Sequence, residues 1–182
     1  MQLTGAPTRS LVAVYQVRAG ESRQRLAVGR VDARGRLVVR ARARSATTFT
    51  AVFTGNASID SATDTVPIRV RAAVTGRMTR FRSRAGRYAI YGARQTLWMV
   101  GRVSPNHAGD CLRFHLQFKV AGRWDRGSGT KCVRMSRSSR ARVYLPGQPH
   151  LVGIPIRVRA EWAGDRVNLG RESDWQYARF SR

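Results

Sequence analysis

Residues 154–162, with the sequence IPIRVRAEW, alternate apolar and polar positions with a period of two. Successive side chains of a β-strand point to opposite faces, so the apolar residues of this stretch would share one face. The charged residues Arg157, Arg159 and Glu161 would share the other. The stretch therefore predicts a strand of an antiparallel sheet with one buried face and one solvated face.

The same alternation recurs along the chain, and no long window carries a helical stripe. Residues 112–120, 36–44 and 66–74 repeat it, and residues 95–103 also indicate a strand. Glycine-containing turn signals separate these stretches, as at Ala121-Gly122. Many short strands at this spacing predict an all-β fold, either a sandwich or a barrel.

An internal repeat divides the chain into two copies. Residues 50–56 align with residues 159–165 at an offset of 109, and residues 14–20 resemble residues 116–122. The copies would meet near residues 72–75, which predicts two tandem sandwich domains, 1–73 and 74–182.

The two copies differ in length. The second has residues 76–110 ahead of its first aligned strand, whereas the first has only residues 1–10 there. A sandwich without its opening strands would expose a sheet edge and an uncovered core. We therefore expect the first domain to be incomplete at its N-terminus; the alternative is a smaller, complete sandwich.

The repeated segments resemble the bacterial immunoglobulin-like repeat domains of secreted or surface actinobacterial proteins. The resemblance rests on residues 49–59, 61–64 and 66–70 in the first copy, and on residues 101–105, 156–160, 162–165 and 173–177 in the second. It implies immunoglobulin-like sandwiches in an exported protein that acts as a spacer, an adhesion module or a ligand-binding module. It implies no catalytic residues.

The composition is strongly basic. Of 182 residues, 34 are Lys or Arg and 10 are Asp or Glu, a net charge of +24; all but Lys119 and Lys131 of the basic residues are arginine. A hydrophobic share of 42% exceeds that of a disordered basic tail. No apolar run is long enough for a membrane-spanning helix, and residues 1–20 show no signal peptide. Localisation outside the cell or on its surface is therefore an implication of the resemblance alone.

Arginine pairs with planar anions, so the excess is open to two interpretations: a polyanion-binding surface, or a compositional bias spread along the chain. The second domain carries 22 basic and 6 acidic residues, against 12 and 4 in the first. We expect non-specific binding to nucleic acid at low salt, and a protein, a cell-surface glycan or another polyanion as partner. The candidate polyanion-binding residues are Arg134, Arg140, Arg142, Arg157, Arg159 and Trp124.

The tryptophans are assigned by their strand phase. Trp162 is in phase with Ile154, Ile156 and Val158, so it is predicted in the core. Trp98 and Trp175 lie on predicted strands and are also assigned to the core. Trp124, beside a glycine turn, is either a core residue or the one exposed aromatic available for stacking.

Cys111 and Cys132 form no cluster typical of zinc, which leaves two free thiols or one disulfide. Both cysteines are in the polar phase of their strands, and a hairpin turning near residues 121–122 would bring them together. An export compartment would oxidise such a pair, so we expect a disulfide on a solvated face.

No set of residues predicts catalysis, a cofactor or a metal site. His107, His115 and His150 lack metal-ligand spacing, and residues 127–131 lack the lysine–serine ending of a phosphate-binding loop. The acids Asp60, Asp64, Asp165, Glu172 and Asp174 are expected to be solvated, with a weak calcium site as the alternative. The expected function is a non-enzymatic extracellular module; the alternative is a polyanion- or nucleic-acid-binding protein that uses arginine-rich strand faces.

Overall fold

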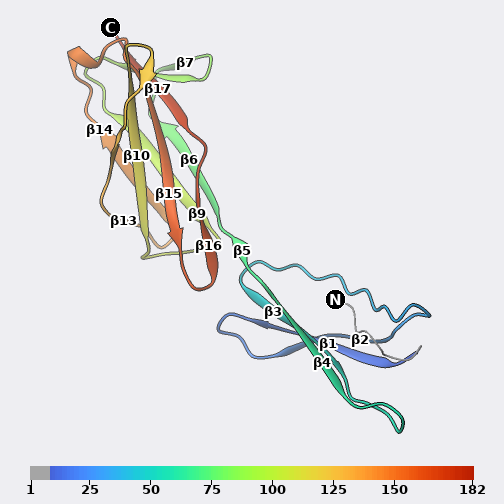
Figure 1. Ribbon diagram of the computed structural model, residues 1–182. Coiled ribbons are helices and arrows are strands. Elements are labelled where there is room, and N and C mark those ends of the chain that lie inside the picture. The colour runs from blue at the N-terminus through green and yellow to red at the C-terminus, as the bar shows by residue number, and fades with distance from the viewer. Residues whose placement is uncertain (1–8) are drawn as a thin grey trace. The chain divides into compact units, whose positions relative to one another are not determined.

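The computed structural model describes residues 9–182 (Figure 1). Its regular elements are β-strands, apart from one 3-10 turn at Pro149–Leu151, so the predicted all-β class is confirmed. The chain divides into two compact units. The first runs to Val70 and includes Arg166–Asn168; the second comprises Arg71–Asp165 and Leu169–Arg182. A short strand, β5 (Val70–Arg71), lies at the division.

The second unit is a sandwich of two sheets. The smaller sheet has the order β14-β9-β6, from strands Arg140–Leu145, Leu97–Ser104 and Ala73–Thr79. The larger has the order β11-β10-β15-β17-β8-β7, and β10 and β15, its longest strands, lie side by side in it (Figure 1). Its strands are β11 (Arg123–Trp124), β10 (Cys111–Val120), β15 (Pro155–Gly164), β17 (Gln176–Ser181), β8 (Tyr88–Gly92) and β7 (Ser83–Ala85). The short strands β12 (Ser128–Gly129) and β13 (Val133–Arg134) pair with β10, and β16 (Asn168–Glu172) pairs with β15.

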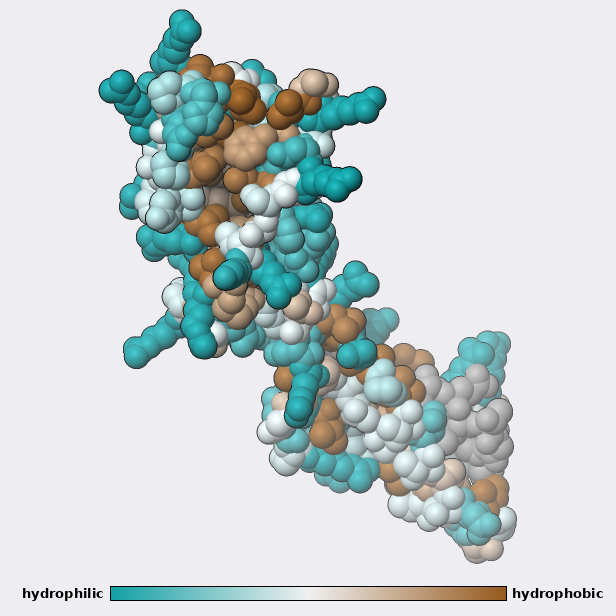
Figure 2. Space-filling view, turned by 60° about the vertical axis from the view of Figure 1, so that its left-hand side comes forward, coloured by the Kyte–Doolittle hydropathy of each residue, from teal (hydrophilic) through white to brown (hydrophobic). Residues whose placement is uncertain are grey.

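The core of the second unit lies between these sheets, and the alternation read from the sequence predicts its residues. Ile156, Val158, Ala160 and Trp162 of β15 are at most 3% exposed. The larger sheet also contributes Leu112, Phe114, Ala178 and Phe180, and the smaller one Leu97, Met99 and Val103. In the space-filling view, hydrophilic side chains project around the unit, with some hydrophobic surface between them (Figure 2).

The first unit has one sheet, in the order β2-β1-β3-β4. In it β1 pairs antiparallel with β2 and with β3, and β3 pairs antiparallel with β4. The strands span β1 (Leu11–Arg18), β2 (Gln24–Arg30), β3 (Thr47–Phe53) and β4 (Ala62–Ile68). Its buried core is small, formed by Val12, Val31, Ala51 and Phe53.

Residues 36–44 were predicted as a strand, and this prediction is wrong. The segment follows a turn in which the Asp32 carboxylate accepts the N–H groups of Arg34 and Arg36, and it then runs extended without strand pairing. Leu37, in the predicted apolar phase, packs on the core of the unit. The alternation therefore identified the inward-facing side chains, but the segment covers the sheet face and does not extend its hydrogen-bonded ladder.

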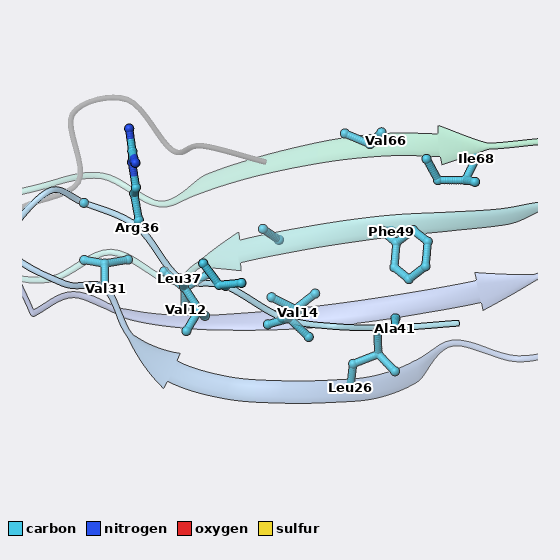
Figure 3. A pocket seen from close by; sticks show the side chains of 14 residues that line it. Val12, Val14, Leu26, Val31, Arg36, Leu37, Ala41, Phe49, Val66 and Ile68 are labelled. Atoms are coloured by element: carbon cyan, nitrogen blue, oxygen red, sulfur yellow. The ribbon is translucent and has the colours of Figure 1, made fainter. Parts of the chain in front are cut away.

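An apolar groove of about 560 Å³ remains between this segment and the sheet. Figure 3 shows Leu37 and Ala41 of the segment over the sheet face that carries Val14 and Phe49. Val66 and Ile68, both on β4, also line the groove, and they are 37% and 40% exposed. The sheet of the first unit is thus only partly covered.

The single strand predicted over residues 66–74 is also wrong. The chain forms β4 up to Ile68, then β5, then β6 from Ala73. β4 pairs with β3, whereas β6 pairs with β9, so the chain leaves one sheet and enters another within a few residues. Period-two alternation continues through this change because it does not depend on which strand is the partner.

The repeat corresponds to equivalent strand pairings. β3 lies between β1 and β4, as β15 lies between β10 and β17. Gly55 and Gly164, aligned at the offset of 109, have φ values of 84° and 92°, which favour glycine. Among the described residues, no helix is long and apolar enough to cross a membrane.

Candidate functional site

The outer face of the larger sheet in the second unit gathers arginine and aromatic side chains. Because Ala178 and Phe180 point into the core, Trp175, Tyr177 and Arg179 fall on the opposite face. The same reasoning places Arg157 and Arg159 outward on β15. We call the following set the arginine–aromatic face: Tyr88 and Arg87, Trp124, Arg157 and Arg159, and Trp175, Tyr177 and Arg179.

Arg157 occupies the centre of this face. Its guanidinium carbon lies 4.4 Å from the ring centroid of Trp124 and 4.3 Å from that of Trp175. Its Nε donates a hydrogen bond to Oε1 of Gln117 at 2.7 Å. A guanidinium over an indole ring is attracted by the ring quadrupole, so these contacts fix the orientation of the side chain.

The guanidinium carbon of the neighbouring Arg159 lies 4.6 Å from the ring centroid of Trp175. Nη1 of Arg159 forms an ion pair with Oε2 of Glu172 at 2.5 Å. On the other side of Arg157, the rings of Trp124 and Tyr177 lie 6.0 Å apart, and those of Tyr177 and Tyr88 lie 5.8 Å apart. The rings and cations therefore form one continuous row across several strands.

Two further cations complete that row. The guanidinium carbon of Arg87 lies 4.1 Å from the ring centroid of Tyr177, and that of Arg179 lies 4.8 Å from the ring centroid of Tyr88. Stacking uses the flat face of a guanidinium and leaves the N–H groups at its edge able to donate to a carboxylate, sulfate or phosphate. The face thus combines oriented anion donors with ring surfaces that stack on a planar or sugar ligand.

The six candidate polyanion-binding residues lie in different places. Arg157, Arg159 and Trp124 belong to the arginine–aromatic face. Arg140 and Arg142 are on β14, in the other sheet, and Arg134 is on β13, paired with Cys111 at the edge of β10. The six residues therefore do not form a single site.

The tryptophan assignments are confirmed in one case and wrong in two. Trp162 is buried, at 2% exposed. Trp175 is only half-buried and stacks on arginines, and Trp98 stacks on Tyr144 outside the core. Trp124 is half-buried and contacts Arg157, so it also lies outside the core.

Sequence reasoning missed five members of this face: Arg87, Tyr88, Trp175, Tyr177 and Arg179. For β17 a signal was present: Phe180 and Ala178 are in the apolar phase, and Trp175 and Tyr177 are in the other. Tyr88 and Arg87 carried no local signal, because β8 joins the sheet through a parallel pairing with β17 that is distant in sequence.

The predicted pairing of Cys111 with Cys132 is confirmed as a pair at disulfide distance, with Cα atoms 4.9 Å apart. Both cysteines are exposed, as their strand phase predicts. The hairpin turns at Ala121-Gly122, where both residues have positive φ and Val120 pairs with Arg123. Such a two-residue turn matches the twist of the flanking strands.

Two groups of side chains in the described part of the chain have donor atoms close enough to hold a metal ion. They are His107 with Asp110 and Asp165, and His115 with Glu161 and Glu172. In the second group each acid already has a partner at 2.5 Å: Glu161 contacts His115, and Glu172 contacts Arg159.

No protein-family model and no curated protein sequence matches the chain.

Proposed function

We propose that the protein is a non-enzymatic extracellular module of immunoglobulin-like type that binds an acidic polysaccharide through the arginine–aromatic face. The observation that carries the proposal is the position of Arg157, held between Trp124 and Trp175 at 4.4 and 4.3 Å. Its donor edge is oriented before any ligand arrives, which lowers the entropy cost of binding.

The class of ligand follows from the chemistry of the row. Sugar rings stack on aromatic faces, and their sulfate or carboxylate groups pair with arginine. The charge of +24 adds a long-range attraction for any polyanion. A location outside the cell is supported by the cysteine pair, since disulfides persist in oxidising compartments.

The proposal is tested by titrating the protein with a heparin oligosaccharide at near-physiological salt, with neutral dextran and single-stranded DNA as comparison ligands. Arg157→Gln removes one charge from the face, and Arg142→Gln removes one from β14 in the other sheet. We expect Arg157→Gln to weaken heparin binding by about tenfold, and Arg142→Gln to weaken it much less. Arg157→Lys keeps the charge but loses the planar donor edge, so it should behave like Arg157→Gln.

Equal losses from Arg157→Gln and Arg142→Gln, with binding that disappears as salt rises, would refute a dedicated site. The arginine excess would then act only as a diffuse charge, as expected of a spacer. Tight binding to DNA that depends on base sequence at the same salt would instead favour the nucleic-acid alternative.

A further inference from the structure

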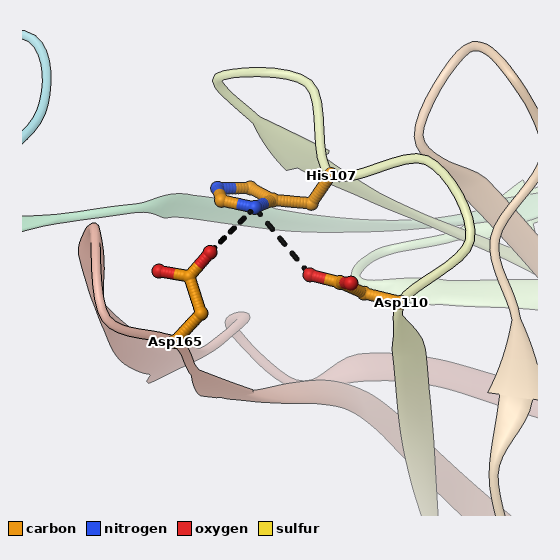
Figure 4. Close-up of side chains that lie close together, drawn as sticks. All are labelled: His107, Asp110 and Asp165. Carbon is orange, nitrogen blue, oxygen red and sulfur yellow. Dashed lines mark ion pairs between the residues drawn. The ribbon is translucent and has the colours of Figure 1, made fainter. Parts of the chain in front are cut away.

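Three side chains from two loops converge at one end of the sandwich in the second unit (Figure 4). His107 and Asp110 lie in the loop between β9 and β10, and Asp165 follows the last residue of β15. Asp165 belongs to the repeated segment 159–165, whose Trp162 packs beneath this loop. The arginine–aromatic face includes none of these residues.

His107 is a buried and firmly held side chain. It is 8% exposed, and its ring lies against Trp162 with centroids 4.0 Å apart. Its backbone N–H donates to Oγ of Ser139 at 3.0 Å, and the Gly109 N–H donates to the Met135 carbonyl at 3.0 Å. The loop therefore fixes the position of the imidazole before any ligand binds.

The two carboxylates face the same nitrogen of this imidazole. Nδ1 of His107 lies 3.5 Å from Oδ2 of Asp110 and 3.4 Å from Oδ2 of Asp165. Both distances are long for a hydrogen bond, and a ring nitrogen has one proton at most to donate. The other nitrogen, Nε2, is buried and makes no hydrogen bond with the described residues. Nδ1 is therefore the ring nitrogen that a ligand shared with the two carboxylates would engage.

We propose that His107, Asp110 and Asp165 form a binding site for a divalent first-row transition cation, with Zn²⁺ as the reference ion. Zinc binds histidine nitrogen and carboxylate oxygen at about 2.0–2.2 Å, so neighbouring ligands of a tetrahedral site lie about 3.3 Å apart. The 3.4 and 3.5 Å separations match that spacing, and all three donor atoms lie within 4.8 Å of one another.

The ligand set also selects the ion and allows its entry. One imidazole with two carboxylates suits Zn²⁺, Co²⁺ or Mn²⁺, whereas Ca²⁺ requires six to eight oxygen ligands. The Asp110 and Asp165 side chains are 43% and 34% exposed, so water reaches the carboxylates and completes the coordination. The bound ion would join the loop before β10 to the loop after β15, next to the Cys111–Cys132 pair.

The test is calorimetric titration of the full chain with Zn²⁺ at a pH above the ordinary pKa of histidine. Asp110→Asn and Asp165→Asn replace a carboxylate by an amide of the same shape, which is a much weaker ligand. His115→Gln is the matched control, because His115 is paired with Glu161 in the other histidine–acid group. Circular dichroism without metal checks that each variant is folded.

We expect one Zn²⁺ per chain for the parent protein and for His115→Gln. Each aspartate variant should bind more than about tenfold more weakly, and the double variant should show no saturable binding. Zn²⁺ should also raise the unfolding temperature of the parent protein and not that of the double variant. Absence of one-to-one binding in the parent, or binding unchanged in the double variant, would overturn the proposal.

Discussion

Tyr91 shows how burial acts on a single titratable group. Its side chain is fully buried, and its hydroxyl donates to the Thr79 carbonyl at 2.7 Å. Burial disfavours the phenolate and raises the pKa of Tyr91 to about 12, above its ordinary value of 10. The folded state therefore favours the neutral hydroxyl, which bonds to carbonyls of β6 and β9.

We predict that the second unit loses stability between pH 10 and 12. In this interval Tyr91 is ionised in the unfolded chain but protonated in the folded one, so each pH unit lowers the free energy of unfolding by about 1.4 kcal/mol. The contribution is complete below pH 10 and is lost as the pH rises to 12. Urea unfolding followed by circular dichroism at several pH values measures the slope.

Tyr91→Phe should reduce that alkaline slope while lowering stability at neutral pH by about 1–3 kcal/mol, because the Thr79 carbonyl loses its partner. Tyr144→Phe is the matched control, since Tyr144 is 63% exposed, and should keep the parent slope. A slope that is the same in all three proteins would contradict the prediction.

At the scale of the strand, the alternation predicted which side chains face inward better than it predicted strand pairing. β10 and β15 follow the prediction closely, because each lies inside a sheet and one face of each is covered. Residues 36–44 have the same alternation and a correct inward phase at Leu37, but they lack a neighbouring strand. Periodicity reports which face is buried, whereas pairing depends on residues far away in sequence.

The candidate sites show the same division. The phase of Arg157 and Arg159 was predictable. The stacking of Arg157 between Trp124 and Trp175 was not, because it requires β11, which carries Trp124, and the residue just before β17 to lie on either side of β10 and β15. The convergence of His107 and Asp165 was likewise not predictable, because 58 positions separate them and only the fold brings their loops together.

A close approach of the two sheets gives a prediction at this scale. A Cβ atom added at Gly101 on β9 would lie 2.4 Å from Cδ2 of Leu112 and 3.1 Å from Cβ of Ala160. Both neighbours are fully buried, so Gly101→Ala should lower the free energy of unfolding by about 1–3 kcal/mol. Chemical unfolding measures this difference.

The control for that variant is Gly129→Ala on β12. A Cβ atom there would lie 3.6 Å from its nearest neighbour, Nδ1 of His115, which is an ordinary contact. We expect this change to alter stability by less than about 0.5 kcal/mol. Equal losses from the two substitutions would show that packing between the sheets is not the cause.

For the whole molecule, the dominant electrostatic property is self-repulsion. The 34 basic residues far outnumber the 10 acidic ones, which leaves a net charge of +24. Pairs such as Arg18–Glu21 and Arg159–Glu172 offset only a small part of the positive charge. Salt therefore screens more repulsion than attraction.

We predict that the unfolding temperature rises as sodium chloride increases from about 10 mM to about 150 mM, a range in which the screening length falls from about 30 Å to about 8 Å. Thermal unfolding followed by circular dichroism, without any polyanion present, measures the effect. A constant or falling temperature would contradict the prediction, and would indicate that local pairs outweigh the net charge.

The apolar groove of the first unit has a practical consequence for such measurements. Fluorescent dyes that detect exposed apolar surface are commonly used to recognise partly unfolded proteins. With Val66, Ile68 and Val38 at 37%, 40% and 81% exposed, this protein offers the dye a surface while it is still folded. A bright signal at low temperature would then describe the native molecule, and a melting curve obtained from such a dye would understate how well the protein is folded.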